Sequence, residues 1–269
     1  MGWLTKFFMD KIYILSWGGG VNSTAMLAMI KLGMLPELNK DNCHIVFADT
    51  GAEMPYTYEH TSRCLQPMAK EGWTCKSISP VNYPELYSGR CQNTTLPAYC
   101  HEKQIIPSRI YKWCSREYKA NPLKKYRIDI CGKNFKENSV MLIGIALEEK
   151  HRAVEDGVEW TRYPLIEQDI DRKGCIELIK KAGLPIARKS GCFFCPNQGK
   201  AQWLELYTDF PELFKQSEEM ERYAVEKSSY YLVRDIPLRQ QINKWVKKIK
   251  ENCKQDDFFE TDRHCLCEL

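Results

Sequence analysis

The sequence predicts an α/β protein, in which a parallel β-sheet carries helices on both faces and a helical extension follows at the C-terminal end. Short apolar runs rich in β-branched residues, such as residues 11–15, 43–48 and 140–145, are typical of buried strands. Segments with a helical pattern separate these runs, and a glycine-rich turn joins the first strand to the first helix. Strands that alternate with helices favour a parallel sheet covered on both faces.

The expected elements follow one another in βαβ order. The first helix is expected over residues 25–35 and ends before Pro36. Asn22, Ser23 and Thr24 precede it as capping residues. The later elements expected are a helix over 55–71, a strand over 74–78, helices over 175–182 and from 198 to 207, and a basic amphipathic helix over 240–254.

Three regions are expected along the chain. Residues 1–10 form an N-terminal extension, residues 11–208 form the α/β domain, and residues 209–269 form a C-terminal helical region with a tail. Residues 81–112 are rich in proline, tyrosine and asparagine. We interpret this segment as an insertion or lid within the α/β domain.

The composition is that of an ordinary soluble globular protein, because 43% of the residues are hydrophobic and 28% are charged. The net charge of +4 and the isoelectric point of about 8.3 permit contact with nucleic acid without indicating it. No stretch reaches the roughly 18 apolar residues of a membrane span, and the first 15 residues of the chain lack a signal-peptide pattern. We therefore expect a cytoplasmic protein without membrane contact.

A glycine loop, Ser16–Ser23, lies between the first expected strand and the first expected helix. Its consecutive residues Gly18, Gly19 and Gly20 let the backbone turn sharply and bring its N–H groups against an anion. The helix N-terminus adds its dipole and its unpaired amides, and the two serines of the loop add hydroxyl donors. The pattern is neither a Walker loop nor a dinucleotide fingerprint. A glycine turn without a ligand is the alternative.

Further motifs follow the glycine loop in the chain. They are Ala48-Asp-Thr-Gly-Ala-Glu53, Cys114–Pro122, Gly144–Arg152, Pro164-Leu165 and Cys192-Phe-Phe-Cys-Pro196. Together with the loop, and over about residues 11–205, they resemble the adenine nucleotide α-hydrolase superfamily. That superfamily includes PAPS reductases, PP-loop ATP pyrophosphatases, tRNA thiolases and the ATPase of DNA phosphorothioation. Within it, this chain resembles the iron–sulfur branch to which the ATPase of DNA phosphorothioation belongs. The resemblance implies a Rossmann-like (HUP-type) fold.

The resemblance implies that the loop binds the phosphates of an adenine nucleotide. The residues that it assigns to this role are Ser16, Gly18, Gly19, Gly20, Asn22 and Ser23. Many members of the superfamily carry aspartate where this chain has Asn22. The asparagine therefore removes a charge that would hold Mg²⁺, the metal ion that would accompany ATP.

Three charged side chains are the candidate catalytic residues. Asp49, with Thr50 beside it, leaves the end of a strand toward the cleft, where its carboxylate would bind a ribose hydroxyl or a metal ion. An Asx turn is the alternative for Asp49. Lys119 and Arg152 would bring positive charge to phosphate oxygens, with solvated surface side chains as the alternative.

Thirteen cysteines without an export signal indicate metal binding rather than disulfides. Cys192 and Cys195 form a Cys-x-x-Cys turn, which ligates one ion or one edge of a cluster. The resemblance adds Cys114 and Cys175, and implies that the four thiolates hold a [4Fe–4S] cluster. Structural zinc, a redox-active dithiol and plain buried cysteines are the alternatives. For Cys253, Cys265 and Cys267, the alternatives are a second metal site, a dithiol that carries sulfur, and a tail with incidental cysteines.

The motifs favour an enzyme that cleaves ATP between its α and β phosphates and adenylates a substrate, such as tRNA or DNA, for sulfur transfer. The loop would then hold the leaving pyrophosphate, and a sulfur donor protein would be a partner. The first alternative is a sulfonucleotide reductase acting on PAPS or APS, whose nucleophile would be Cys265 or Cys267. The second alternative is a non-catalytic nucleotide-binding protein.

Overall fold

The structure is a computed structural model that describes most of the chain. The described residues are 11–153, 160–228, 230–233 and 236–256. The expected N-terminal extension, residues 1–10, and the tail cysteines Cys265 and Cys267 lie outside the described residues. Cys253 belongs to a described helix, but its side chain is not described.

The chain forms two compact units. The first unit consists of residues up to 96 together with 115–191, and the second consists of 97–114 together with residues from 192 onward. The expected insertion over 81–112 is therefore divided between the two units. The expected boundary near residue 208 lies within the second unit.

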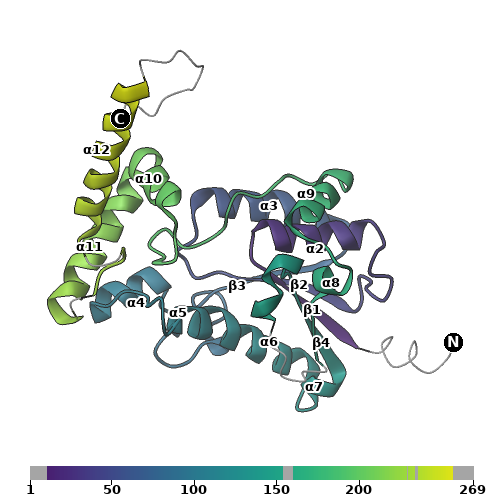
Figure 1. The fold of residues 1–269 in the computed structure, drawn as a ribbon. Coiled ribbons are helices and arrows are strands. Elements are labelled where there is room, and N and C mark those ends of the chain that lie inside the picture. The colour runs from purple at the N-terminus through teal and green to yellow at the C-terminus, as the bar shows by residue number, and fades with distance from the viewer. Residues whose placement is uncertain (1–10, 154–159, 229, 234–235, 257–269) are drawn as a thin grey trace. The chain divides into compact units, whose positions relative to one another are not determined.

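The first unit contains a five-stranded parallel sheet in the order β3-β2-β1-β4-β5 (Figure 1). The strands are β1 (Ile12–Trp17), β2 (Cys43–Ala48), β3 (Thr74–Ile78), β4 (Ser139–Ile143) and β5 (Thr161–Arg162). In the central strand, Leu15 pairs with Ile45 of β2 on one side and with Leu142 of β4 on the other. The predicted fold class, a Rossmann-like α/β sheet, is confirmed.

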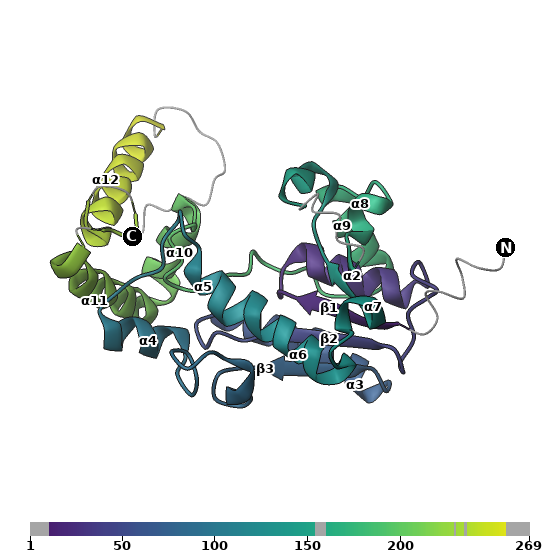
Figure 2. The ribbon, with the colours of Figure 1, turned by 90° about the horizontal axis from the view of Figure 1, so that it is seen from below.

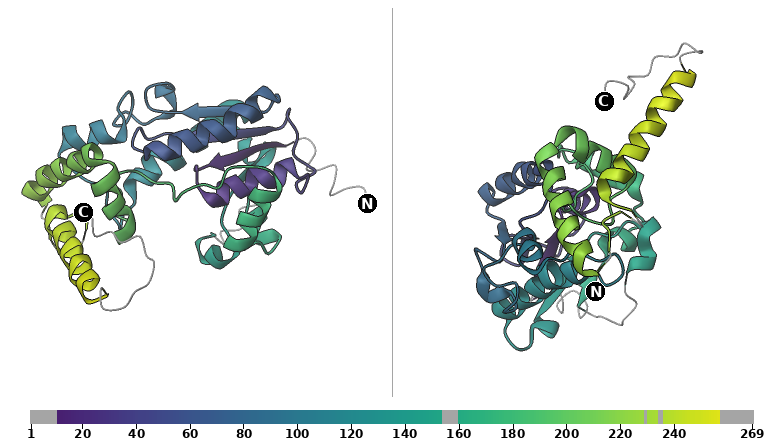
Figure 3. Two further views of the ribbon diagram at one scale, coloured as in Figure 1. Left: turned by 90° about the horizontal axis from the view of Figure 1, so that it is seen from above. Right: turned by 90° about the vertical axis from the view of Figure 1, so that its left-hand side faces the viewer.

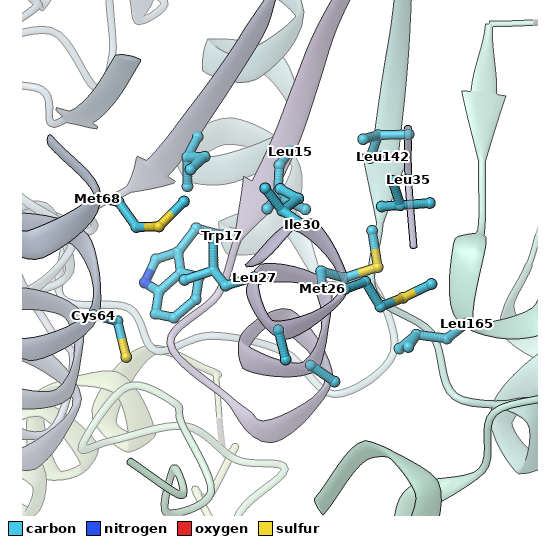
Figure 4. Packing of buried hydrophobic residues seen from close by; sticks show 14 of the residues in the cluster. Leu15, Trp17, Met26, Leu27, Ile30, Leu35, Cys64, Met68, Leu142 and Leu165 are labelled. Carbon is cyan, nitrogen blue, oxygen red and sulfur yellow. The ribbon is translucent and has the colours of Figure 1, made fainter. Parts of the chain in front are cut away.

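Four helices cover one face of this sheet. They are α2 (Val21–Lys31), α3 (Pro55–Lys70), α8 (Pro164–Glu167) and α9 (Arg172–Lys181), which the left panel of Figure 3 shows in front of the strands. Alternate strand residues, including Leu15, Trp17 and Leu142, point into the core beneath them (Figure 4). The apolar α2 is buried on nearly every side, because it packs against both the sheet and α9.

The other face carries α6 (Asn121–Cys131), as Figure 2 shows from below, and α7 (Phe135–Asn138) follows it. The contact of α6 with the sheet includes a hydrogen bond of 2.8 Å between the Tyr126 hydroxyl and Nδ1 of His44 in β2. Burial, assisted by the charge of Lys76, lowers the pKa of His44. Both faces of the sheet are therefore covered.

The second unit is helical. It contains most of α4 (Leu96–Lys103), α5 (Trp113–Ser115), α10 (Lys200–Asp209), α11 (Pro211–Ser228) and α12 (Leu238–Asp256). Glu221 of α11 is buried, and its carboxylate accepts the backbone N–H groups of Leu232 (2.8 Å) and Leu238 (2.6 Å). This carboxylate therefore holds the start of α12. Within the described residues, no helix is long and apolar enough to cross a bilayer.

Candidate nucleotide-binding site

The glycine loop joins the end of β1 to the start of α2, at the carboxyl edge of the sheet. Gly19 has a φ of +66°, and a Cβ placed on it would lie 2.8 Å from Cγ2 of Thr57. A Cβ on Gly20 would lie 2.9 Å from Oγ of Ser190. Gly18 is exposed, and no heavy atom lies closer than 4.0 Å to the position of its Cβ. The loop therefore presents bare backbone to solvent at Gly18 and is packed closely behind it.

The helix α2 begins at Val21, four residues earlier than the sequence pattern predicts, and Gly20 is its N-cap. The expected capping residues form the first turn instead. The Ser23 hydroxyl accepts from the Gly20 amide (3.1 Å) and donates to the Gly20 carbonyl (2.9 Å), which also accepts from the Thr24 hydroxyl (2.8 Å). Ser23 therefore fixes the turn from inside, rather than pointing a donor outward.

A chain of polar side chains crosses the first turn of α2. The amide nitrogen of Asn22 donates to Oε2 of Glu149 at 3.0 Å, and its oxygen accepts from Nη1 of Arg172 at 3.1 Å. Arg152 donates to the other oxygen of Glu149 at 2.6 Å. Glu149 and Arg152 belong to the 3₁₀ helix after β4, and Arg172 opens α9. Two guanidinium groups therefore lie at the N-terminal end of α2.

Close backbone packing brings this 3₁₀ helix to the loop. Gly144 follows β4, and a Cβ on it would lie 3.0 Å from the backbone of Asn22. A residue with a side chain would push the end of β4 away from α2. The lack of space for a side chain thus explains why the Gly144–Arg152 motif begins with glycine.

Asp49 lies at the end of β2, where the sequence placed it, and its carboxylate forms an Asx turn. Oδ1 accepts from the backbone N–H of Gly51 and from the Tyr58 hydroxyl, each at 2.8 Å. Burial, followed by the charge of Asp49, raises the pKa of Tyr58, so its hydroxyl stays a donor. Thr50, the neighbouring residue, is buried, and its hydroxyl accepts from the Ala52 amide at 3.2 Å. The Asx turn does not exclude the predicted contact with a ribose hydroxyl or a metal ion, because Asp49 is partly exposed.

Lys119 pairs with a carboxylate that the sequence motif contained but that received no role. Nζ of Lys119 lies 2.7 Å from Oε1 of Glu53, whose side chain is fully buried while that of Lys119 is 35% exposed. Lys119 belongs to the π-helical turn Arg116–Ala120, and Glu53 precedes α3. A buried carboxylate requires such a partner, so part of the charge of Lys119 is used within the protein.

The segment before residue 192 lies against the start of α3. The Arg188 guanidinium stacks 4.3 Å from the ring centre of Tyr56, and the Tyr56 hydroxyl donates to the Lys189 carbonyl at 3.4 Å. The Met54 amide donates to the Gly191 carbonyl at 3.1 Å. This arrangement brings Ser190 against Gly20. Apart from its basic residues, no sequence pattern indicated that this segment lies beside the loop.

A buried histidine supports the loop from behind. Nε2 of His60 lies 2.9 Å from the Thr24 hydroxyl, and its ring stacks on Trp17 with centres 5.9 Å apart. The single hydroxyl proton of Thr24 goes to the Gly20 carbonyl, which places the histidine proton on Nε2. Burial, with a smaller effect of the Arg63 charge, lowers the pKa of His60.

His60 should make stability depend on pH. Below about pH 6.5, the unfolded chain takes up a proton at this residue and the folded chain does not, so acid favours unfolding. We expect the wild type to lose stability between pH 7 and pH 5 faster than His60→Gln, by at most about 1.4 kcal/mol per pH unit. Urea unfolding of both proteins across this range measures the difference. His44 is present in both proteins and therefore cancels in the comparison. If the free energy of unfolding falls equally with pH in both proteins, His60 does not contribute to the pH dependence.

The four cysteines expected to bind a cluster lie in different units. Cys175 of α9 is fully buried in the hydrophobic core of the first unit, where burial raises the pKa of its thiol to about 11. Cys114, Cys192 and Cys195 belong to the second unit. The Cys195 amide donates to the Cys192 carbonyl at 3.1 Å, which is the expected tight turn.

No group of three or more histidine, cysteine, aspartate or glutamate side chains is arranged around a common metal position in the described part of the chain. The ligand role of Cys114, Cys175, Cys192 and Cys195 therefore stays a prediction, and Cys175 lies in the apolar core of its own unit. No disulfide joins any of the ten cysteines whose side chains are described.

No family model matches the chain. An uncharacterized protein of Methanocaldococcus jannaschii is 23% identical over 239 residues, which cover 81% of this chain and 43% of that protein. The chain thus spans less than half the length of this curated relative. Among solved structures, the U34-tRNA thiolase NcsA from Methanococcus maripaludis with its [4Fe-4S] cluster is 14% identical, with a TM-score of 0.44. That alignment covers 97% of this chain and 81% of the thiolase.

Proposed function

We propose that the chain is an enzyme that binds ATP with its phosphates at the glycine loop and cleaves it between the α and β phosphates. The observation that carries this proposal is the exposed backbone at Gly18, at the carboxyl edge of a parallel sheet and at the N-terminal end of α2. Exposed backbone at a helix N-terminus suits an anion, because unpaired amides and the helix dipole both favour negative charge there.

The position of the other motifs supports the same site. The segments that follow β1, β2 and β4 carry Ser16–Ser23, Ala48–Glu53 and Gly144–Arg152. Carboxyl ends of parallel strands meet at one edge of a sheet, which is where open α/β sheets bind their ligands. Arg152 and Arg172 add positive charge beside the loop.

In the proposed reaction, an oxygen of the substrate attacks the α-phosphorus and the bond to the β-phosphate breaks. The backbone amides of the loop stabilise the negative charge that develops on the leaving pyrophosphate. In this proposal, Asp49 accepts a hydrogen bond from a ribose hydroxyl. A sulfur nucleophile then displaces AMP from the adenylated substrate, for which a nucleic acid such as tRNA or DNA is the proposed class, with a sulfur donor protein as partner.

The products formed by the purified chain test this proposal. With ATP labelled on its α-phosphate, and with bulk tRNA or DNA present, we expect labelled AMP or labelled nucleic acid together with pyrophosphate. Labelled ADP would contradict cleavage between the α and β phosphates. Release of sulfite from PAPS would identify the sulfonucleotide reductase instead, and binding of ATP without any product would identify a non-catalytic protein.

We propose that Cys114, Cys192 and Cys195 take part in a metal site in the second unit, with iron–sulfur as the first candidate and zinc as the alternative. The reaction at phosphorus requires none of these thiols. The proposed metal site is supported by the chemistry of thiolates, because closely spaced thiolates in a turn bind soft metals.

A matched pair of variants tests the metal site. We expect Cys192→Ala to lose the metal, because it removes a ligand. Cys175→Ala should keep the metal and lose about 1–2 kcal/mol of stability, because it removes a buried sulfur from the core. Iron and zinc analysis of anaerobically purified protein, with absorbance at about 400 nm, measures this. Equal loss of metal in both variants would instead make Cys175 a ligand.

A further inference from the structure

The charges of the cations around the glycine loop are balanced in different ways. Lys119 pairs with the carboxylate of Glu53, and Arg152 pairs with the carboxylate of Glu149. Arg172 instead bonds through its side chain to the neutral amide of Asn22. In the described part of the chain, no ion pair joins its guanidinium to a carboxylate, so the guanidinium is not used in a salt bridge.

The backbone that carries Arg172 is held in place. Asp171 caps α9 by accepting from the Gly174 amide at 2.8 Å. The Arg172 amide donates to Oε2 of Glu148 at 3.1 Å, and the Leu147 amide donates to the Ile170 carbonyl at 2.9 Å. The start of α9 is thus fixed to the 3₁₀ helix beside the loop. The exposed guanidinium uses Nη1 toward Asn22 and has other N–H groups for an anion.

The amide of Asn22 fits this position for a chemical reason. It donates to Glu149 through its nitrogen and accepts from Arg172 through its oxygen, which a single carboxylate cannot do. An aspartate at position 22 would lie beside the carboxylate of Glu149 and would neutralise Arg172 at the same time. A cation bound between the two carboxylates would relieve that repulsion. Asparagine keeps the charge of Arg172 available without a metal ion.

We infer that Arg172, oriented by Asn22, binds the diphosphate group of the nucleotide at the glycine loop, and that this binding is independent of divalent cations. The inference rests on the proposed nucleotide site and specifies its phosphate contacts. The guanidinium supplies the positive charge that Mg²⁺ would otherwise bring to the phosphates. Its planar group can donate two parallel hydrogen bonds to two phosphate oxygens.

Equilibrium binding of inorganic pyrophosphate to the full chain, in EDTA and in excess Mg²⁺, tests the inference. We expect the wild type to bind with affinities that agree within about threefold in the two conditions. Arg172→Gln should weaken binding by about ten- to a hundredfold in both, because it removes charge-assisted hydrogen bonds. Lys173→Gln is the matched control, since it removes the same charge from the next exposed residue, and it should stay within about threefold of the wild type.

Asn22→Asp gives the second arm of the experiment. We expect it to bind pyrophosphate at least about tenfold more weakly than the wild type in EDTA and to recover in Mg²⁺. The inference is overturned if the wild type binds only with Mg²⁺, or if Arg172→Gln behaves like Lys173→Gln. Binding that depends on Arg172 without conversion of ATP would contradict the proposed reaction and leave the inference standing. Thermal melting of each variant checks that it is folded.

Discussion

Replacing Gly19 by alanine is expected to destabilise the protein by about 2–4 kcal/mol and to weaken nucleotide binding by more than about tenfold. Gly19 adopts a left-handed φ of +66°, which costs a residue with a side chain about 1–2 kcal/mol. The new Cβ would also lie 2.8 Å from Cγ2 of the buried Thr57, whose β-branched side chain has little freedom to turn away.

Gly18→Ala is the matched control for stability, because the nearest heavy atom lies 4.0 Å from its Cβ position and its φ is not left-handed. We expect it to unfold within about 1 kcal/mol of the wild type. Urea unfolding and equilibrium binding of ATP measure both variants. If Gly19→Ala has the same free energy of unfolding and the same affinity for ATP as the wild type, the close packing of α3 against the loop does not determine the conformation of the site.

Replacing Lys119 by methionine is expected to lower the free energy of unfolding by about 2–4 kcal/mol. The carboxylate of Glu53 is fully buried and loses its lysine partner, and partial exposure of the lysine reduces the cost below that of a fully buried pair. Lys119→Met combined with Glu53→Gln should recover much of this loss, because no buried charge then lacks its partner.

The same double variant separates the two roles of Lys119. If Lys119 also contacts the phosphates, the double variant should regain stability without regaining conversion of ATP. Stability from urea unfolding and pyrophosphate release from ATP are the two measurements. Equal stability of Lys119→Met and the wild type would contradict the structural role of the ion pair.

The strands were predictable because they are buried on both faces. In such strands nearly every residue is apolar, so a short run such as residues 43–48 is visible without knowledge of its neighbours. The start of α2 was missed for a local reason. The polar residues Asn22–Thr24 are typical of caps, but the third glycine takes that position because Ser23 and Thr24 bond back to it.

The pairings within the site were not predictable, because they join residues that are distant in the chain. Glu53 lies 66 residues from Lys119, and Asn22 lies 150 residues from Arg172. Lys119 and Arg152 were predicted to bring positive charge to phosphates, but a single sequence does not show the carboxylates that balance them. Arg172 carries no local signal, since one arginine at a helix start is common.

The ligand role of Cys175 was predicted from the family resemblance alone, since a single cysteine before a helix carries no metal signal of its own. In the structure Cys175 lies one helical turn from the buried Ile179, on the side of α9 that joins the core packed against α2. Helix phase therefore decides which side of α9 carries Cys175, and its role as a metal ligand stays a prediction.

A crystal structure of the protein with a non-hydrolysable ATP analogue tests where the nucleotide binds. We expect the phosphates to contact the exposed backbone of the glycine loop at Gly18, with Arg172 against the phosphate oxygens. An analogue bound elsewhere on the protein, with the loop in contact with solvent alone, would contradict it.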